Sequence, residues 1–231
     1  MTKEHTLDIV YVVREGEENE TLRHSLRSLK NLKHGKVFIS GYCPKWVKNV
    51  IPLKREQKSQ SDLENSTANL LQALDNDKLS DDFVLMNDDF FIMEPIEELP
   101  IQHQGLLDDK IANYLETRPL QAWSLIKTRD ELRRLGVDSL LLKSYELHTP
   151  FVYNKKKLKE LFDKVELPNF AVRSRTLYGN YYHIGGEQTY DVKTTEPLQQ
   201  AFQSVQSGRG EPTAAWADIT TRLSEPSDYE G

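Results

Sequence analysis

The first half of the chain alternates short apolar runs with segments that carry leucines at helical spacing. Residues 7–13, 36–40 and 82–86 are apolar runs bounded by polar or glycine-containing segments. Such runs are typical of strands that are buried in a sheet. Residues 49–53 form a shorter run that contains Pro52. Because proline removes a backbone donor, we expect this strand at the edge of the sheet.

Two segments between these runs predict helices. Residues 22–29 carry leucines at i, i+4 and i+7, and either Asn19 or Thr21 can cap the helix that they indicate. Residues 61–75 show helical spacing as well, and they begin with a serine that is followed three residues later by glutamate, as in a capping box. Strands that alternate with helices predict an α/β fold, with a mostly parallel sheet flanked by helices.

The second half of the chain is less regular. Residues 140–145 predict a strand and residues 148–150 a turn, and Asn154 can cap a helix whose apolar face lies in residues 158–165. Residues 207–212 are rich in glycine and polar residues, which predicts an exposed loop. The regular sheet is therefore expected in the first half.

Composition is that of a globular protein. The 231 residues are 29% charged and 38% hydrophobic, which suits a single domain and excludes a mainly disordered chain. The formal net charge is −6 and the basic residues are scattered, so a dedicated nucleic-acid surface is not expected. Cys43 is the only cysteine, which fits a reducing compartment. With neither a leader-like start nor an apolar run approaching about 18 residues, we expect a cytoplasmic protein.

An acidic pair interrupts the apolar passage that begins at residue 83. Asn87, Asp88 and Asp89 stand between two runs of apolar residues. Adjacent buried carboxylates repel each other, and a divalent cation removes that repulsion. Since Mg²⁺ and Mn²⁺ are commonly held by carboxylates and substrate phosphates, the pattern predicts a metal site for a phosphorylated ligand, most simply a nucleoside diphosphate. The structural alternative is a turn that Asp88 and Asp89 cap.

Four blocks of sequence resemble a known family. Residues 20–29 (ETLRHSLRSL), 36–47, 83–91 (FVLMNDDFF) and 223–230 (LSEPSDYE) resemble, in order and spacing, the conserved region of the Stealth sugar-phosphate transferases. They also resemble the related small glycosyltransferase-like proteins often encoded by bacteriophages of Gram-positive bacteria. The early Trp-Val-Asp-Gly block of Stealth proteins is absent, and residues 12–16 (VVREG) stand there instead. This difference favours the phage-type glycosyltransferase branch.

The resemblance implies a GT-A-like, Rossmann-type nucleotide-sugar transferase fold in a single domain. Residues 1–100 would then bind the nucleotide sugar and residues 101–231 the acceptor. In such a fold Asp89 would bind Mn²⁺ or Mg²⁺ and Asp88 would bond the ribose or sugar of the donor. The expected function is metal-dependent transfer of a sugar from a nucleotide-diphosphate sugar to an acceptor hydroxyl. Sugar 1-phosphate transfer of the Stealth type and non-catalytic nucleotide or sugar binding are the alternatives.

If the chain is phage-encoded, the resemblance places it in the host cytoplasm. Its acceptor would be a virion protein, a modified DNA base or a polysaccharide. A metal-dependent nuclease would also use an acidic pair, but it would need a basic channel, and this acidic chain shows none in its sequence.

Further residues are candidates to hold the donor beside Asn87 and Asp88. Arg14 directly follows the first predicted strand, and Arg23 matches the Leu-Arg block of the family. Asn65 and Thr67 lie in the first turns of the second predicted helix, where free backbone N–H groups suit phosphate oxygens. Arg173 can neutralise a diphosphate. A solvated arginine or a helix cap is the structural alternative for each.

Two histidines and two acids are candidates for the chemistry. His148 is expected in a turn ahead of a helix, where it can complete a metal shell or act as general base on the acceptor hydroxyl. His183 competes for the same role. If the reaction inverts the anomeric configuration, Asp191 and Glu187 are alternative bases. A histidine whose nitrogens bond the backbone is the structural alternative.

Overall fold

The computed structural model describes residues 6–59, 61–137, 139–205 and 213–231. The chain folds into two compact units, of which the first contains Met1–Leu99, His148–Lys155 and Val192–Gly231. The second contains Pro100–Leu147 and Lys156–Asp191. The expected single domain with halves that meet near residue 100 stays a prediction. The predicted loop at residues 207–212 lies outside the described residues.

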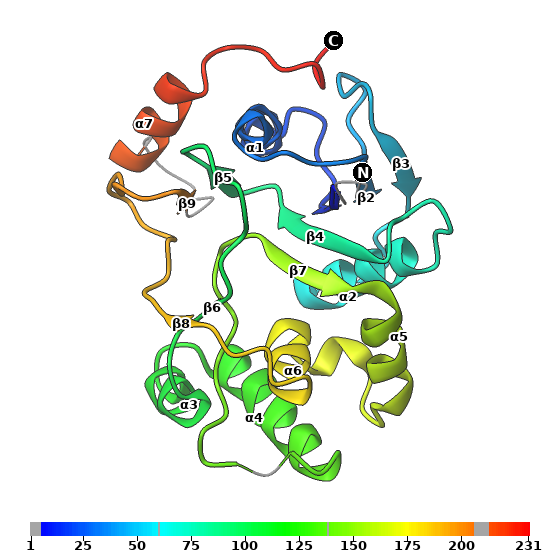
Figure 1. Ribbon diagram of the computed structural model, residues 1–231, viewed down its shortest axis with the longest axis vertical. Helices are drawn as coiled ribbons and strands as arrows, with labels where there is room; N and C mark the ends of the chain where they lie inside the picture. The colour runs from blue at the N-terminus through cyan, green and yellow to red at the C-terminus, as the bar shows by residue number, and fades with distance from the viewer. Residues whose placement is uncertain (1–5, 60, 138, 206–212) are drawn as a thin grey trace, which may run out of the picture. The chain divides into compact units, whose positions relative to one another are not determined.

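The first unit is built on a five-stranded sheet of order β3-β2-β1-β4-β7 (Figure 1). β1 (Asp8–Val13), β2 (Val37–Gly41), β3 (Ile51–Lys54) and β4 (Asp82–Asn87) are parallel, and β7 (Phe151–Asn154) pairs antiparallel with β4. The prediction of a mostly parallel sheet is confirmed, and the proline-containing strand lies at its edge. The sequence pattern did not reveal β7, because a four-residue strand has almost no periodicity of its own.

Helices α1 (Glu20–Ser28) and α2 (Asp62–Leu74) cover opposite faces of this sheet (Figure 1). Alternate residues of β1 pack with the leucines of α1 in one apolar cluster, while α2 contacts β1 and β2. A strand covered on both faces has no exposed side chain, which explains the continuous apolar run of β1. Both predicted caps form: Asn19 Oδ1 accepts from the N–H of Leu22 at 3.1 Å, and Ser61 Oγ accepts from that of Glu64 at 3.3 Å.

A two-stranded ladder and a helix complete the first unit. β5 (Phe90–Ile92) follows the Asp88-Asp89 turn and pairs antiparallel with β9 (Phe202–Ser204). Phe91 packs in a small apolar cluster with residues of α7 (Ala214–Arg222). A short 3-10 turn, η1 (Leu29–Asn31), extends α1. Through β5, the acidic turn is therefore joined to chain that lies more than a hundred residues later in the sequence.

The second unit is mainly helical. Residues 140–145 do not form the predicted strand: Leu140 and Leu141 are 82% and 71% exposed, and residues 142–144 meet residues 104–107 through an isolated bridge and three backbone hydrogen bonds. That prediction was wrong because the chain that pairs with residues 142–144 enters a helix at Leu107, so the pairing does not extend into a strand ladder. The predicted helix after Asn154 is confirmed as α5, which begins in the first unit. The elements are α3 (Leu107–Leu115), α4 (Pro119–Arg134), α5 (Lys155–Lys164), η2 (Asn169–Ala171), α6 (Ser174–Tyr181) and the parallel pair β6 (Gln102–His103) and β8 (Glu187–Gln188).

In the described part of the chain, no helix combines the length and the apolar character that crossing a membrane requires.

Candidate functional site

The carboxyl ends of β1 and β4 lie at a reversal in the sheet. β2 and β3 are on one side of β1, whereas β4 is its neighbour on the other side. Val12 is in register with Asn87, so the chain leaves both strands at the same edge, through Arg14 after β1 and through Asp88 after β4. In open α/β sheets, ligands bind beyond the carboxyl ends of the strands at such a switch point.

Asp88 is tied to the loop that follows β1. Asn19 Nδ2 donates to Asp88 Oδ2 at 3.0 Å, while the other side-chain atom of Asn19 caps α1. Burial raises the pKa of Asp88, and the Asp89 carboxylate raises it further; the hydrogen bond from Asn19 and the charge of Arg14 act in the opposite direction. The Asp88 carboxylate therefore gains stability from any ligand that brings it a hydrogen-bond donor.

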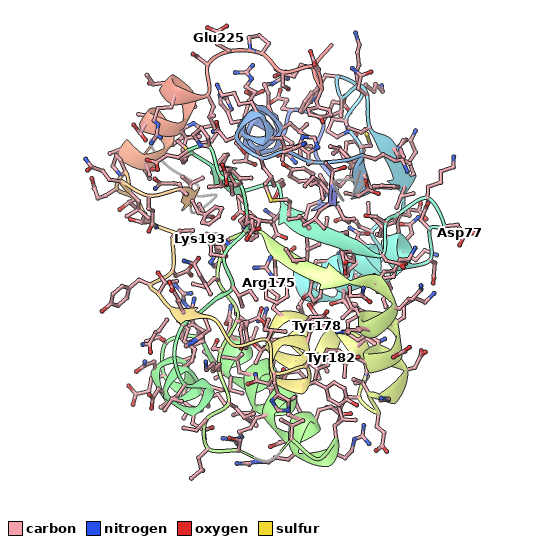
Figure 2. All side chains as sticks on the ribbon, in the orientation of Figure 1. Asp77, Arg175, Tyr178, Tyr182, Lys193 and Glu225 are labelled. Carbon is pink, nitrogen blue, oxygen red and sulfur yellow. The ribbon has the colours of Figure 1, made fainter. Side chains whose placement is uncertain are left out.

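Asp89 is bound by a lysine of the same unit. Lys193 Nζ lies 2.9 Å from Asp89 Oδ2, and Ser204 Oγ lies 3.4 Å from the same oxygen. Asp89 is only 9% exposed, and Lys193 lies on the segment that leads into β9 (Figure 2). The ammonium group thus supplies the compensation that a buried carboxylate needs.

A divalent ion that bridges Oδ2 of Asp88 and Oδ2 of Asp89 would compete with the groups that these atoms already bind. Such an ion would lie beside the Lys193 ammonium, which would repel it, and Asp88 Oδ2 already accepts a hydrogen bond. Over residues 6–59, 61–137, 139–205 and 213–231, no three His, Cys, Asp or Glu side chains gather into a group that could hold a metal. The sequence-based metal set, which is Asp88, Asp89, His148 and His183, therefore stays a prediction.

The predicted donor residues of α2 lie at the same edge of the sheet as Arg14. Arg14 pairs with Asp62 at 3.4 Å, with both side chains largely exposed. Asn65 donates to the carbonyl of Ser59 at 2.6 Å and so anchors the segment ahead of α2. Thr67 is half-buried in the same helix. The structure thus brings Arg14 to the first turn of α2, and it gives Asn65 a structural contact.

Arg23 is held by contacts with other side chains of the chain. Its guanidinium lies 3.0 Å from Glu20 and 3.1 Å from Glu230, and it stacks 4.1 Å above the ring of Trp46. Arg27 binds the same Glu230 through two nitrogens, at 2.8 and 2.7 Å. These contacts fasten the C-terminal residues onto α1, so the structure assigns Arg23 a structural contact; its predicted role in binding phosphate stays a prediction.

His148 belongs to the same unit as the acidic turn. Its ring meets Phe90 edge-on, with 6.0 Å between the ring centroids. Phe90 directly follows Asp89 in the chain, so the structure brings this candidate base to the segment that carries the two carboxylates.

The remaining predicted site residues belong to the second unit. Arg173 directly precedes α6 and donates through Nε to Ser124 Oγ of α4 at 2.7 Å. His183 is exposed and follows α6 with a φ of 50°, and Glu187 is exposed in β8. Asp191 is half-buried at the end of the unit. Their catalytic and donor-binding roles stay predictions.

Sequence reasoning missed Lys193 and the contact between Asn19 and Asp88. Asn19 carried a signal as a helix cap, but no pattern linked it to Asp88, 69 residues later. Lys193 is 104 residues from Asp89, in a segment without periodicity, so nothing in the sequence marked it.

Comparison of the chain with models of known protein families finds no match. Comparison with curated proteins finds none either. The resemblance to Stealth-like and phage-type transferases accordingly rests on the residues quoted above.

Proposed function

We propose that the chain is a nucleotide-sugar transferase with a GT-A-like site at the carboxyl ends of β1 and β4. The observation that carries the proposal is the hydrogen bond from Asn19 to Asp88, which joins the loops after these two strands at the switch point of the sheet. A half-buried carboxylate held at that place suits the hydroxyl groups of a ribose or sugar, which are hydrogen-bond donors.

The proposed reaction is glycosyl transfer from a nucleotide-diphosphate sugar. The acceptor hydroxyl oxygen forms a bond to the anomeric carbon, and the bond from that carbon to the diphosphate oxygen breaks. The hydroxyl proton passes to a general base, and the nucleoside diphosphate leaves with the bonding electron pair. In this proposal Asp88 orients the donor, and His148 is the candidate base of the first unit because it lies beside Phe90.

The test is a thermal-shift panel of UDP, GDP, CDP, ADP and dTDP on wild type and Asp88→Asn. A ligand present at a hundred times its Kd stabilises the native state by about 2.7 kcal/mol, which corresponds to a rise in Tm of about 5–10 °C for a chain of this size. Asp77→Asn is the matched control, since it removes the same charge from an exposed turn (Figure 2). We expect one nucleotide to stabilise wild type and the control, and Asp88→Asn to lose most of that shift.

Product analysis distinguishes the alternatives. The chain is incubated with a sugar nucleotide that carries the nucleoside identified by the panel. If a sugar is transferred, nucleoside diphosphate should be released. Sugar 1-phosphate transfer would release nucleoside monophosphate instead, and a non-catalytic binding protein would release neither. If no nucleotide raises Tm in any variant, the transferase proposal is wrong.

A further inference from the structure

Lys193 occupies the place beside Asp89 where the sequence predicts a metal ion. We propose that the Lys193 ammonium is the cation that binds the diphosphate of the donor, so that the site takes its ligand without a divalent metal. This inference rests on the proposed function, and it specifies how the anionic part of the substrate is recognised.

The ammonium group has hydrogen-bonding capacity to spare. Of its three N–H bonds, one is directed to Asp89 Oδ2 at 2.9 Å, and within the described residues no other acceptor for Nζ is found. The Lys193 side chain is 25% exposed, whereas that of Asp89 is 12% exposed. The lysine is thus anchored on its buried side and accessible on the other, which leaves donors for an external oxyanion.

The backbone fixes the lysine at this place. The N–H of Ser204 donates to the carbonyl of Val192 at 3.0 Å, and that of Thr194 donates to the carbonyl of Ser204 at 3.2 Å, so two bonds flank Lys193. Ser204 in turn pairs with Phe90 across the β5-β9 ladder, directly after the acidic turn. Lys193 is therefore held on the turn by main-chain hydrogen bonds as well as by its ion pair, unlike a mobile surface lysine.

Charge at the turn favours one cation or the other, but not both together. Asp88 and Asp89 carry two formal negative charges; Lys193 pairs with Asp89, and Arg14, which also pairs with Asp62, attracts Asp88. A divalent ion at Asp89 Oδ2 would have to displace the ammonium, because two cations cannot share that oxygen without strong repulsion. Lysine and metal thus compete for this oxygen of Asp89, which makes the inference testable.

The first experiment measures binding of the nucleoside diphosphate identified by the panel to the full chain, by calorimetry, in EDTA and in Mn²⁺. Wild type is expected to bind with the same Kd in both buffers. Binding that appears only with Mn²⁺ would overturn the inference while leaving the proposed function intact. Absence of binding in both buffers would instead refute the proposed function, so the two failures are distinguishable.

The second experiment exchanges the cation. Losing a charge-assisted hydrogen bond weakens binding by about tenfold to a hundredfold, so Lys193→Met in EDTA should show a Kd raised by that factor. Mn²⁺ should restore binding to Lys193→Met, since the substitution frees Asp89 for a metal. A purely structural lysine would give no such rescue.

Two further variants control for folding. Lys193→Arg keeps the charge and should bind within a few-fold of wild type, even if the methionine variant is unstable. Lys78→Met removes an exposed lysine from the turn ahead of β4 and should leave Kd unchanged. The inference is refuted if wild type and Lys193→Met bind with equal Kd values in EDTA. It is also refuted if Lys193→Met binds more weakly than wild type and Mn²⁺ does not change its Kd.

Discussion

Replacing Glu230 with glutamine removes the carboxylate that joins the C-terminal residues to α1. Glu230 Oε1 accepts from Arg27 Nε at 2.8 Å, and Oε2 accepts from Arg27 Nη2 at 2.7 Å and from Arg23 Nη1 at 3.1 Å. The backbone N–H of Ser227 also donates to Oε1, at 2.9 Å. In Figure 1 the C-terminal residues, drawn in red, pass over α1, the helix that carries Arg23 and Arg27.

The pKa of Glu230 sets the size of the effect. Burial alone would raise this pKa, but hydrogen bonds from Arg27, Ser227 and Arg23 lower it from an ordinary value of 4.5 to about 2. At about 1.4 kcal/mol for each pKa unit, that fall corresponds to about 3 kcal/mol. Because Arg23 is still 24% exposed and solvent screens the pair, we expect a loss of about 2 kcal/mol, or about 4–8 °C in Tm.

The assay is thermal unfolding at pH 7 followed by circular dichroism, with Glu225→Gln as the control. Glu225 is exposed on the same C-terminal segment, so its substitution should change Tm by less than about 2 °C (Figure 2). Equal Tm values for the two variants would show that the Glu230 carboxylate does not stabilise the fold.

The pH dependence gives a second check on Glu230. A carboxyl whose pKa is lower in the folded chain contributes stability that is fully present above its unfolded pKa and is lost as pH falls through its folded pKa. The difference in stability between wild type and Glu230→Gln should therefore narrow from about pH 4.5 down to about pH 2. A difference that stays constant over this window would contradict the assignment of the low pKa to Glu230.

Two further substitutions test the frame of the site. Asn19→Ser keeps a side chain that can cap α1, so Tm should fall by no more than about 4 °C. The variant loses the donor to Asp88, so nucleotide binding measured by calorimetry should weaken severalfold. Unchanged binding would show that this contact is structural only. Gly41→Ala should lower Tm by more than about 4 °C, because φ is 108° and the new Cβ would lie 2.3 Å from the carbonyl oxygen of Val13. Gly16→Ala also places alanine at a positive φ, of 158°, but its new Cβ would meet no atom within 4 Å, so it should lower Tm by less. Equal Tm values for the two alanine variants would contradict the clash at Gly41.

The elements whose signals are local could be predicted from the sequence alone. The apolar runs of β1, β2 and β4 mark strands that helices bury on both faces, and the caps Asn19 and Ser61 mark where helices begin. The place of the acidic pair followed from the same pattern, because Asn87-Asp88-Asp89 ends an apolar run and polar residues there must lie at the end of a strand.

The groups that those side chains contact follow from the three-dimensional fold. The apolar run at residues 140–145 pairs only briefly with residues 104–107, which lead into α3, whereas the short segment Phe151–Asn154 became β7 because β4 lies beside it. Lys193 reaches Asp89 across 104 residues, and Glu230 reaches Arg23 across 207. Periodicity records which face of an element is buried, but partners so far apart in the chain are set by sheet register and loop paths, which bring backbones together independently of any local pattern.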